Sequence, residues 1–138
     1  MSAAGKPPGF TLIEMLVVLA ITGLVSALAF PAIDRAMRRQ AFEAAANAID
    51  LGLREARADA IRTSRPIRFV LGSDRRSIVR DGAPPIVIPP DMTLSLPTRG
   101  IGFYGDGTST GGDVTIGGIG RGRRLSVDPG SGAVAAQR

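Results

Sequence analysis

The side chains that most often carry out acid–base, nucleophilic or metal chemistry are scarce in this sequence. It contains no histidine and no cysteine. The commonest general base, the commonest neutral metal ligand and every thiolate are therefore missing. Disulfides are excluded for the same reason. The composition argues against hydrolytic, redox and zinc enzymes, and we expect neither a metal site nor a cofactor.

Two patterns resemble ligand sites but are better explained by turns. The stretch from Gly100 to Gly105 matches G-x-G-x-x-G, yet no helix pattern follows it, as a dinucleotide site requires. Asp106, Asp113 and Asp128 lie near glycine-rich segments, and their spacing fits no calcium loop. We expect these aspartates to form turns.

Arg121, Arg123 and Arg124 form the densest basic cluster. Without interleaved aromatic residues, such a cluster offers phosphate attraction at most. We interpret it as a solvated hairpin turn that projects between glycines, with contact to DNA or to a partner as the alternative. The formal net charge of +5 is otherwise spread along the chain, so nucleic-acid binding is not favoured.

Glu14 is the unusual acid, because it interrupts an apolar run that begins at Phe10. From Met15 to Ile33 no residue is charged, and at about 1.5 Å per residue this segment spans about 28 Å, close to the thickness of a bilayer core. A secretory signal is one interpretation: Lys6 would precede an apolar region, and cleavage after Ala29 would leave a mature chain starting at Phe30. A plain membrane anchor is another, with Glu14 at the headgroup level. Neither gives Glu14 a role.

The segment Gly9-Phe10-Thr11-Leu12-Ile13-Glu14 resembles the leader junction of type IV pilins and type II secretion pseudopilins. The resemblance implies that a prepilin peptidase removes residues 1–9, cutting between Gly9 and Phe10, and that Phe10 becomes N-methylated. It also implies that Glu14 stays in the mature protein, where its carboxylate pairs with the α-amine of a neighbouring subunit during filament assembly. Paired charges are much cheaper in an apolar surrounding than single ones.

Two helix-weakening residues, Gly23 and Pro31, lie within the apolar run. A mild kink is one interpretation. In pilin-like filaments a segment between such residues loses helicity on assembly, which the resemblance extends to Gly23–Pro31. The basic residues that follow, Arg35, Arg38 and Arg39, would lie outside the cytoplasm in the orientation of this family, against the positive-inside rule.

The rest of the chain predicts an amphipathic helix and then short strands. An apolar face recurs at helical spacing beyond Pro31, ending before Pro66, at Phe42, Ala46, Ile49, Leu53, Ala56 and Ala60. Alternating apolar residues separated by glycine and proline then indicate strands at 67–71, 77–79, 86–88, 92–96, 101–103, 114–116 and 125–127. We expect an α+β fold: a membrane-spanning helix over 10–33, its amphipathic continuation over 34–64, and an antiparallel β-domain over 65–138.

The tail resembles the H-type minor pseudopilins, a group shared with FimT-like minor pilins. The resemblance is carried by Ile101 to Gly112, Val114-Thr115-Ile116, Arg123 to Asp128 and Gly130-Ser131-Gly132. A glycine-rich turn over Gly117–Gly122 and a bare Ala133-Val134-Ala135 ending depart from that pattern.

The resemblance implies a non-catalytic subunit of the type II secretion pseudopilus. It would be anchored in the bacterial inner membrane by a single span, with its C-terminal domain in the periplasm, and would lie near the pseudopilus tip. Its partners would be other major and minor pseudopilins, the prepilin peptidase and methyltransferase, and the assembly platform with its ATPase. The alternative is a FimT-like minor pilin that binds DNA during natural transformation.

Overall fold

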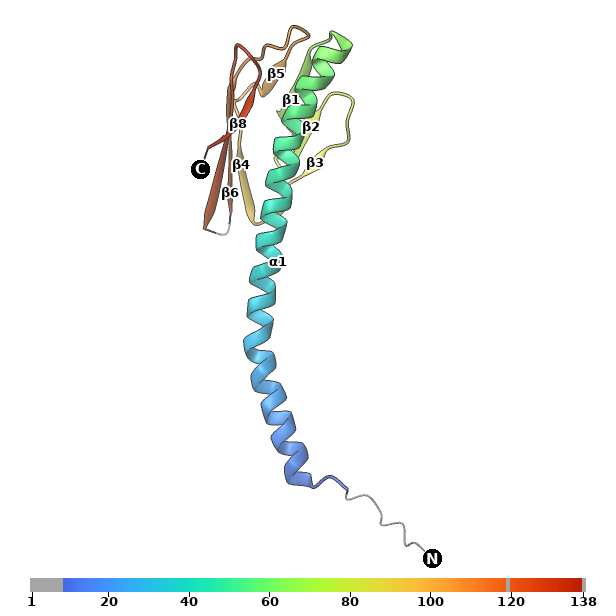
Figure 1. The fold of residues 1–138 in the computed structure, drawn as a ribbon, viewed down its shortest axis with the longest axis vertical. Coiled ribbons are helices and arrows are strands. Elements are labelled where there is room, and N and C mark those ends of the chain that lie inside the picture. The colour runs from blue at the N-terminus through green and yellow to red at the C-terminus, as the bar shows by residue number, and fades with distance from the viewer. Residues whose placement is uncertain (1–8, 119, 138) are drawn as a thin grey trace, which may run out of the picture. The chain divides into compact units, whose positions relative to one another are not determined.

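The computed structural model describes residues 9–118 and 120–137. A helix, α1 (Leu12–Thr63), is followed by short strands (Figure 1). These strands are β1 (Ile67–Leu71), β2 (Ser77–Arg80), β3 (Ile86–Val87), β4 (Met92–Ser95), β5 (Ile101–Phe103), β6 (Gly112–Gly118), β7 (Arg121–Val127) and β8 (Val134–Gln137). This order confirms the predicted α+β fold, with a long N-terminal helix before an antiparallel β-domain.

The chain divides into two compact units, residues 1–37 and 38–138. In the described part of the first unit, α1 begins at Leu12 and continues through Pro31. Its large apolar side chains are uncovered all round, with exposed fractions that run from 48% at Met15 to 79% at Leu12. A helix that is apolar on every side is stable only where lipid or other protein surrounds it.

In the second unit, α1 buries one face against the β-strands (Figure 1). All the face positions predicted from the sequence are buried: Phe42, Ala46, Ile49, Leu53, Ala56 and Ala60. Ala45 and Gly52 are buried with them. Alanine and glycine at these positions let the helix backbone approach the strands closely.

The strands form two antiparallel four-stranded sheets, in the orders β3-β2-β1-β5 and β4-β6-β7-β8. Alternate residues of each sheet point into the core. Phe69 and Ile101, paired across β1 and β5, are fully buried, and so are Val114 and Leu125, paired across β6 and β7. The core is aliphatic apart from a few phenylalanines.

An ion-pair network joins the second half of α1 to β2. Arg80, whose side chain is 14% exposed, contacts Glu55 at 3.0 Å and Asp59 at 3.1 Å. Two carboxylates one helical turn apart thus share a largely buried guanidinium. Removing both carboxylates would leave the largely buried Arg80 without a counter-charge, so this network favours one placement of β2 along the helix.

Three sequence interpretations need correction. The glycine-rich turn predicted over Gly117–Gly122 is shorter, because β6 continues to Gly118 and β7 begins at Arg121. Arg121, Arg123 and Arg124 therefore lie within β7 rather than on a projecting turn. The ending described as bare contains a strand, β8, which pairs with β7. One valine followed by two alanines and a glutamine gives a weak strand signal, so pairing with β7 determines this element.

The turn role predicted for Asp106 and Asp128 is confirmed. Asp106 accepts hydrogen bonds from the hydroxyl and backbone N–H of Thr108, at 2.7 and 3.0 Å. Asp128 accepts from the backbone N–H and hydroxyl of Ser131, at 2.7 and 2.8 Å. These bonds lower the pKa of each carboxyl, because they favour its charged form. Asp113 lies instead on β6 and is exposed.

Gly52 offers a test of the helix–sheet contact. A Cβ there would lie 2.8 Å from Cδ1 of Ile86 and 3.1 Å from Cε2 of the fully buried Phe69. We predict that Gly52→Val destabilises the fold by about 1–3 kcal/mol through overpacking, measured by urea unfolding of the full chain in detergent. Ala58→Val, on an exposed position of the same helix, is the control and costs only a few tenths of a kcal/mol. An unchanged unfolding midpoint for Gly52→Val would contradict the close contact.

The β7–β8 turn offers a test of pH dependence. Because the folded-state pKa of Asp128 is lowered, the unfolded chain binds more protons, and stability rises with pH. The contribution of Asp128 to stability is complete above about pH 4, the ordinary pKa of an aspartate. It is lost as the pH falls through the pKa of Asp128 in the folded protein. We predict that Asp128→Asn makes the acid-side loss of the unfolding midpoint shallower. Asp113→Asn is the control for removing one negative charge, and equal slopes for the two variants would contradict this role.

Candidate functional site

The N-terminal candidate residues lie together at the start of α1. Gly9 and Phe10 precede the helix and are exposed, Phe10 to 75%. Apart from its chain neighbours, no described atom lies within 4 Å of a Cβ placed on Gly9. Cleavage of the peptide bond between these two residues stays a prediction.

Glu14 lies in the first turn of α1 and is exposed. Its backbone N–H donates to the hydroxyl of Thr11 at 3.3 Å, so Thr11 is the N-cap of the helix. An acid in the first turn is also favoured by the helix dipole. Thr-x-x-Glu before an apolar run is the sequence signature of a capping box, and our sequence interpretation of Glu14 missed it.

Gly23 and Pro31 both lie inside the continuous helix. A Cβ on Gly23 would meet nothing within 4 Å, so this position leaves open surface for a neighbouring helix. At Pro31 the backbone carbonyl accepts a hydrogen bond from Nε of Arg35 at 3.0 Å. Thr22 and Ser26 also donate their hydroxyls to carbonyls one turn earlier, which weakens and bends helices slightly.

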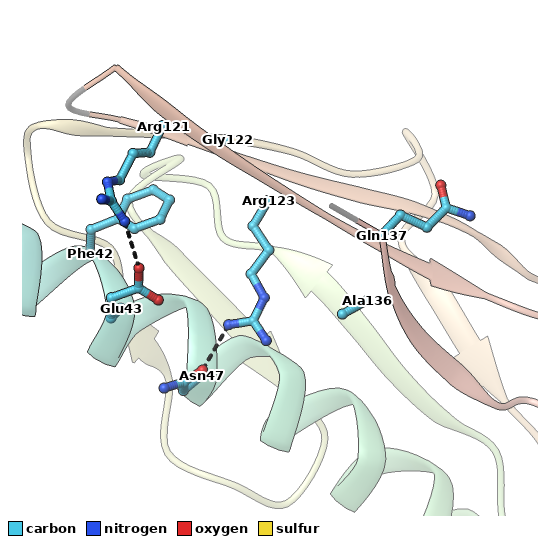
Figure 2. Close-up of a pocket in the computed structure, with 8 residues that line it drawn as sticks. All are labelled: Phe42, Glu43, Asn47, Arg121, Gly122, Arg123, Ala136 and Gln137. Atoms are coloured by element: carbon cyan, nitrogen blue, oxygen red, sulfur yellow. Dashed lines mark hydrogen bonds and ion pairs between the residues drawn. The ribbon is translucent and has the colours of Figure 1, made fainter.

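The three candidate arginines do not form one cluster. Residues alternate between the two faces of β7, and Arg123 shares its face with the buried Leu125. Arg121 and Arg123 point toward α1, where they contact Glu43 at 3.3 Å and Asn47 at 2.7 Å (Figure 2). Arg124 lies on the opposite face of the sheet. The alternation with Leu125 and Val127 is visible in the sequence and would have separated Arg123 from Arg124.

Arg121 and Arg123 line an open groove of about 770 Å³ between α1 and strands β7 and β8 (Figure 2). The helix contributes Phe42, Glu43 and Asn47, and β8 contributes Ala136 and Gln137. The described residues include no group of three or more acidic side chains arranged to hold a metal ion. The chemistry that this groove offers is polar and cationic.

By length and composition, α1 could cross a membrane. It contains a stretch that is long and apolar enough to span a bilayer. A signal sequence near an N-terminus would pass the same test, so this measure alone does not distinguish the two. The prepilin-like motif before the helix favours a membrane-spanning helix that stays in the mature protein over a signal sequence that is removed.

Comparison with known families identifies that motif independently. The family described as "Prokaryotic N-terminal methylation motif" matches residues 8–30. No curated protein matches the chain, and no solved structure matches it. The match covers the glycine, the phenylalanine, the acid and most of the apolar run.

These features support a pilin-like assignment, which rests on the N-terminal motif and on the α+β architecture. The chain has a prepilin-type N-terminus, an apolar helix suited to a single-pass inner-membrane anchor, and an α+β architecture of pilin type. The motif implies processing by a prepilin peptidase and assembly with other pilins.

Proposed function

We propose that this chain is a minor pseudopilin of a type II secretion system, of the H type. The observation that carries the proposal is the prepilin-type motif at the head of a helix whose apolar surface is uncovered on every side. Residues 1–9 are the leader, which is removed between Gly9 and Phe10, and Phe10 is then methylated. Residues 10–33 hold the protein in the inner membrane and form its contact in the filament.

In this proposal Glu14 sets the axial register of assembly. Its carboxylate is costly in an apolar surrounding by a few kcal/mol. Cleavage creates a positively charged α-amine on Phe10 of a neighbouring subunit. This amine and the Glu14 carboxylate neutralise each other. The Thr11 cap contributes separately, because it fixes the start of the helix and therefore the position of the carboxylate.

The segment from Gly23 to Pro31 is the part of α1 that we expect to lose helicity on assembly. Glycine and proline at its two ends weaken a helix, and the hydroxyl of Ser26 within it donates to the carbonyl of Thr22. Residues 34–64 carry the periplasmic domain formed by residues 65–138.

The assignment to the H type rests on the resemblance of the tail, from Ile101 to Gly132. A β-domain of two small sheets against the helix is compatible with it. As a pseudopilin the chain would catalyse no reaction: assembly with major and minor pseudopilins, driven by an ATPase at the inner-membrane platform, would move folded proteins toward the outer membrane.

Substitutions at Glu14 and Thr11 test the charge pair. Glu14→Gln keeps a residue suited to the capping box but removes the charge. We predict normal membrane insertion and normal processing at Phe10, with at least a tenfold loss of crosslinking to neighbouring subunits from a photoreactive residue at position 16. Thr11→Val removes the cap oxygen, keeps the carboxylate, and should retain most crosslinking.

Two results would contradict this account. One is wild-type crosslinking by Glu14→Gln, which would show that the charge is not needed. The other is an equal loss of crosslinking in Thr11→Val, which would show that Thr11 and Glu14 act by capping the helix. Asp113→Asn, which removes one negative charge from an exposed position on β6, controls for the loss of charge itself.

A further inference from the structure

The groove between α1 and the β7–β8 hairpin carries an uncompensated positive charge. Glu43 neutralises Arg121, at 3.3 Å. Arg123 is half-buried, and its Nη1 donates to the neutral amide oxygen of Asn47 at 2.7 Å (Figure 2). Among the residues that the structure describes, no carboxylate forms an ion pair with Arg123. A guanidinium has five N–H donors, so most of its capacity to bind a carboxylate is unused.

The same groove is bordered by a sheet edge. β8 is the last strand of its sheet. Its hairpin is closed by a hydrogen bond from Asp128 N–H to Ala133 C=O, at 3.0 Å. By the alternation of an antiparallel ladder, the backbone groups of Val134 and Ala136 then point away from β7. Arg54 confirms this direction, because it donates to the carbonyl of Val134 at 3.1 Å. Ala136, which lines the groove, presents its N–H and C=O to that edge.

We propose that this groove binds an extended, acidic segment of a partner protein as an additional strand on β8. The partner's backbone would bond to the exposed groups of Ala136, as in other cases of strand addition. A carboxylate on the added strand would accept two hydrogen bonds from the fork of Arg123. The small side chain of Ala136 leaves room for the partner's residue beside Phe42.

Charge and geometry favour a protein strand over nucleic acid. A nucleic-acid site needs several cations along one face, usually with aromatic stacking platforms. Here Arg124 is on the other face of the sheet and Arg121 is already paired with Glu43. One available guanidinium beside an open strand edge matches a single carboxylate on an extended peptide.

This inference concerns a different site from the N-terminal segment, so either proposal can fail without the other. The probe is a fluorescein-labelled peptide, Thr-Glu-Val-Glu-Thr, whose two glutamates lie on one face when extended. Its binding to the full chain in neutral detergent is followed by fluorescence anisotropy. We expect saturable binding, weakened at least tenfold when glutamine replaces both glutamates.

Neighbouring residues on the two faces of β7 provide matched variants. Arg123→Gln should weaken peptide binding by about tenfold or more, the loss expected for a charged hydrogen bond. Arg124→Gln removes the same charge from the other face and should stay within about twofold of the wild type. Ala136→Pro deletes an N–H that faces the edge and not the ladder, so it should abolish binding while the unfolding midpoint of the chain stays close to wild type.

Three results would overturn the proposal. The first is no saturable binding of the peptide by the wild-type chain. The second is an equal loss in Arg123→Gln and Arg124→Gln, which would indicate general attraction between charges. The third is full displacement of the peptide by a DNA oligonucleotide of equal charge, together with an equal dependence of DNA binding on Arg123 and Arg124, which would make the surface a nucleic-acid site.

Discussion

The apolar surface of the first half of α1 is the constraint on which the rest of this protein depends. The chain leaves that surface uncovered, from Phe10 to Met37. Side chains of this size cost on the order of 1.5–3 kcal/mol each when left in water. The helix therefore requires lipid or other helices around it. A protein with this segment functions within a membrane or within an assembly of such helices.

The second half of the same helix packs against the two sheets. Its buried face is built from small residues, Ala46, Gly52, Ala56 and Ala60 among them, so the sheets approach closely. Polar contacts around the rim fix the helix to both sheets. Arg80 joins β2 to the helix, Arg57 donates to the carbonyl of Ser131 in the β7–β8 turn, and Arg123 donates to Asn47. These contacts hold the helix against both sheets, while β8 remains the last strand of its sheet and Arg123, among the described residues, forms no ion pair with a carboxylate.

Local patterns made much of this fold predictable, and non-local contacts explain what was not. The helix and the strand at Ile67–Leu71 follow from spacing and from proline boundaries. The division into two sheets depends on pairings between distant segments, such as β1 with β5, which one sequence does not reveal. β8 forms because β7 offers it a partner, and Gly52 is close to Phe69 only after the helix has packed. At the N-terminus, the resemblance to a prepilin junction singled out Glu14, whose charge pairing stays a prediction, whereas the cap provided by Thr11 was overlooked although its signature was present.

We propose that Glu14 belongs to a processed N-terminus, because only cleavage before Phe10 creates a cation that can pair with it. Mass spectrometry of the mature protein, isolated from the membrane of a cell with prepilin peptidase, tests this most directly. The account predicts an N-terminal peptide that begins with N-methylated Phe10 and contains Glu14. A mature chain that begins at Phe30, or one that retains Met1, would contradict it.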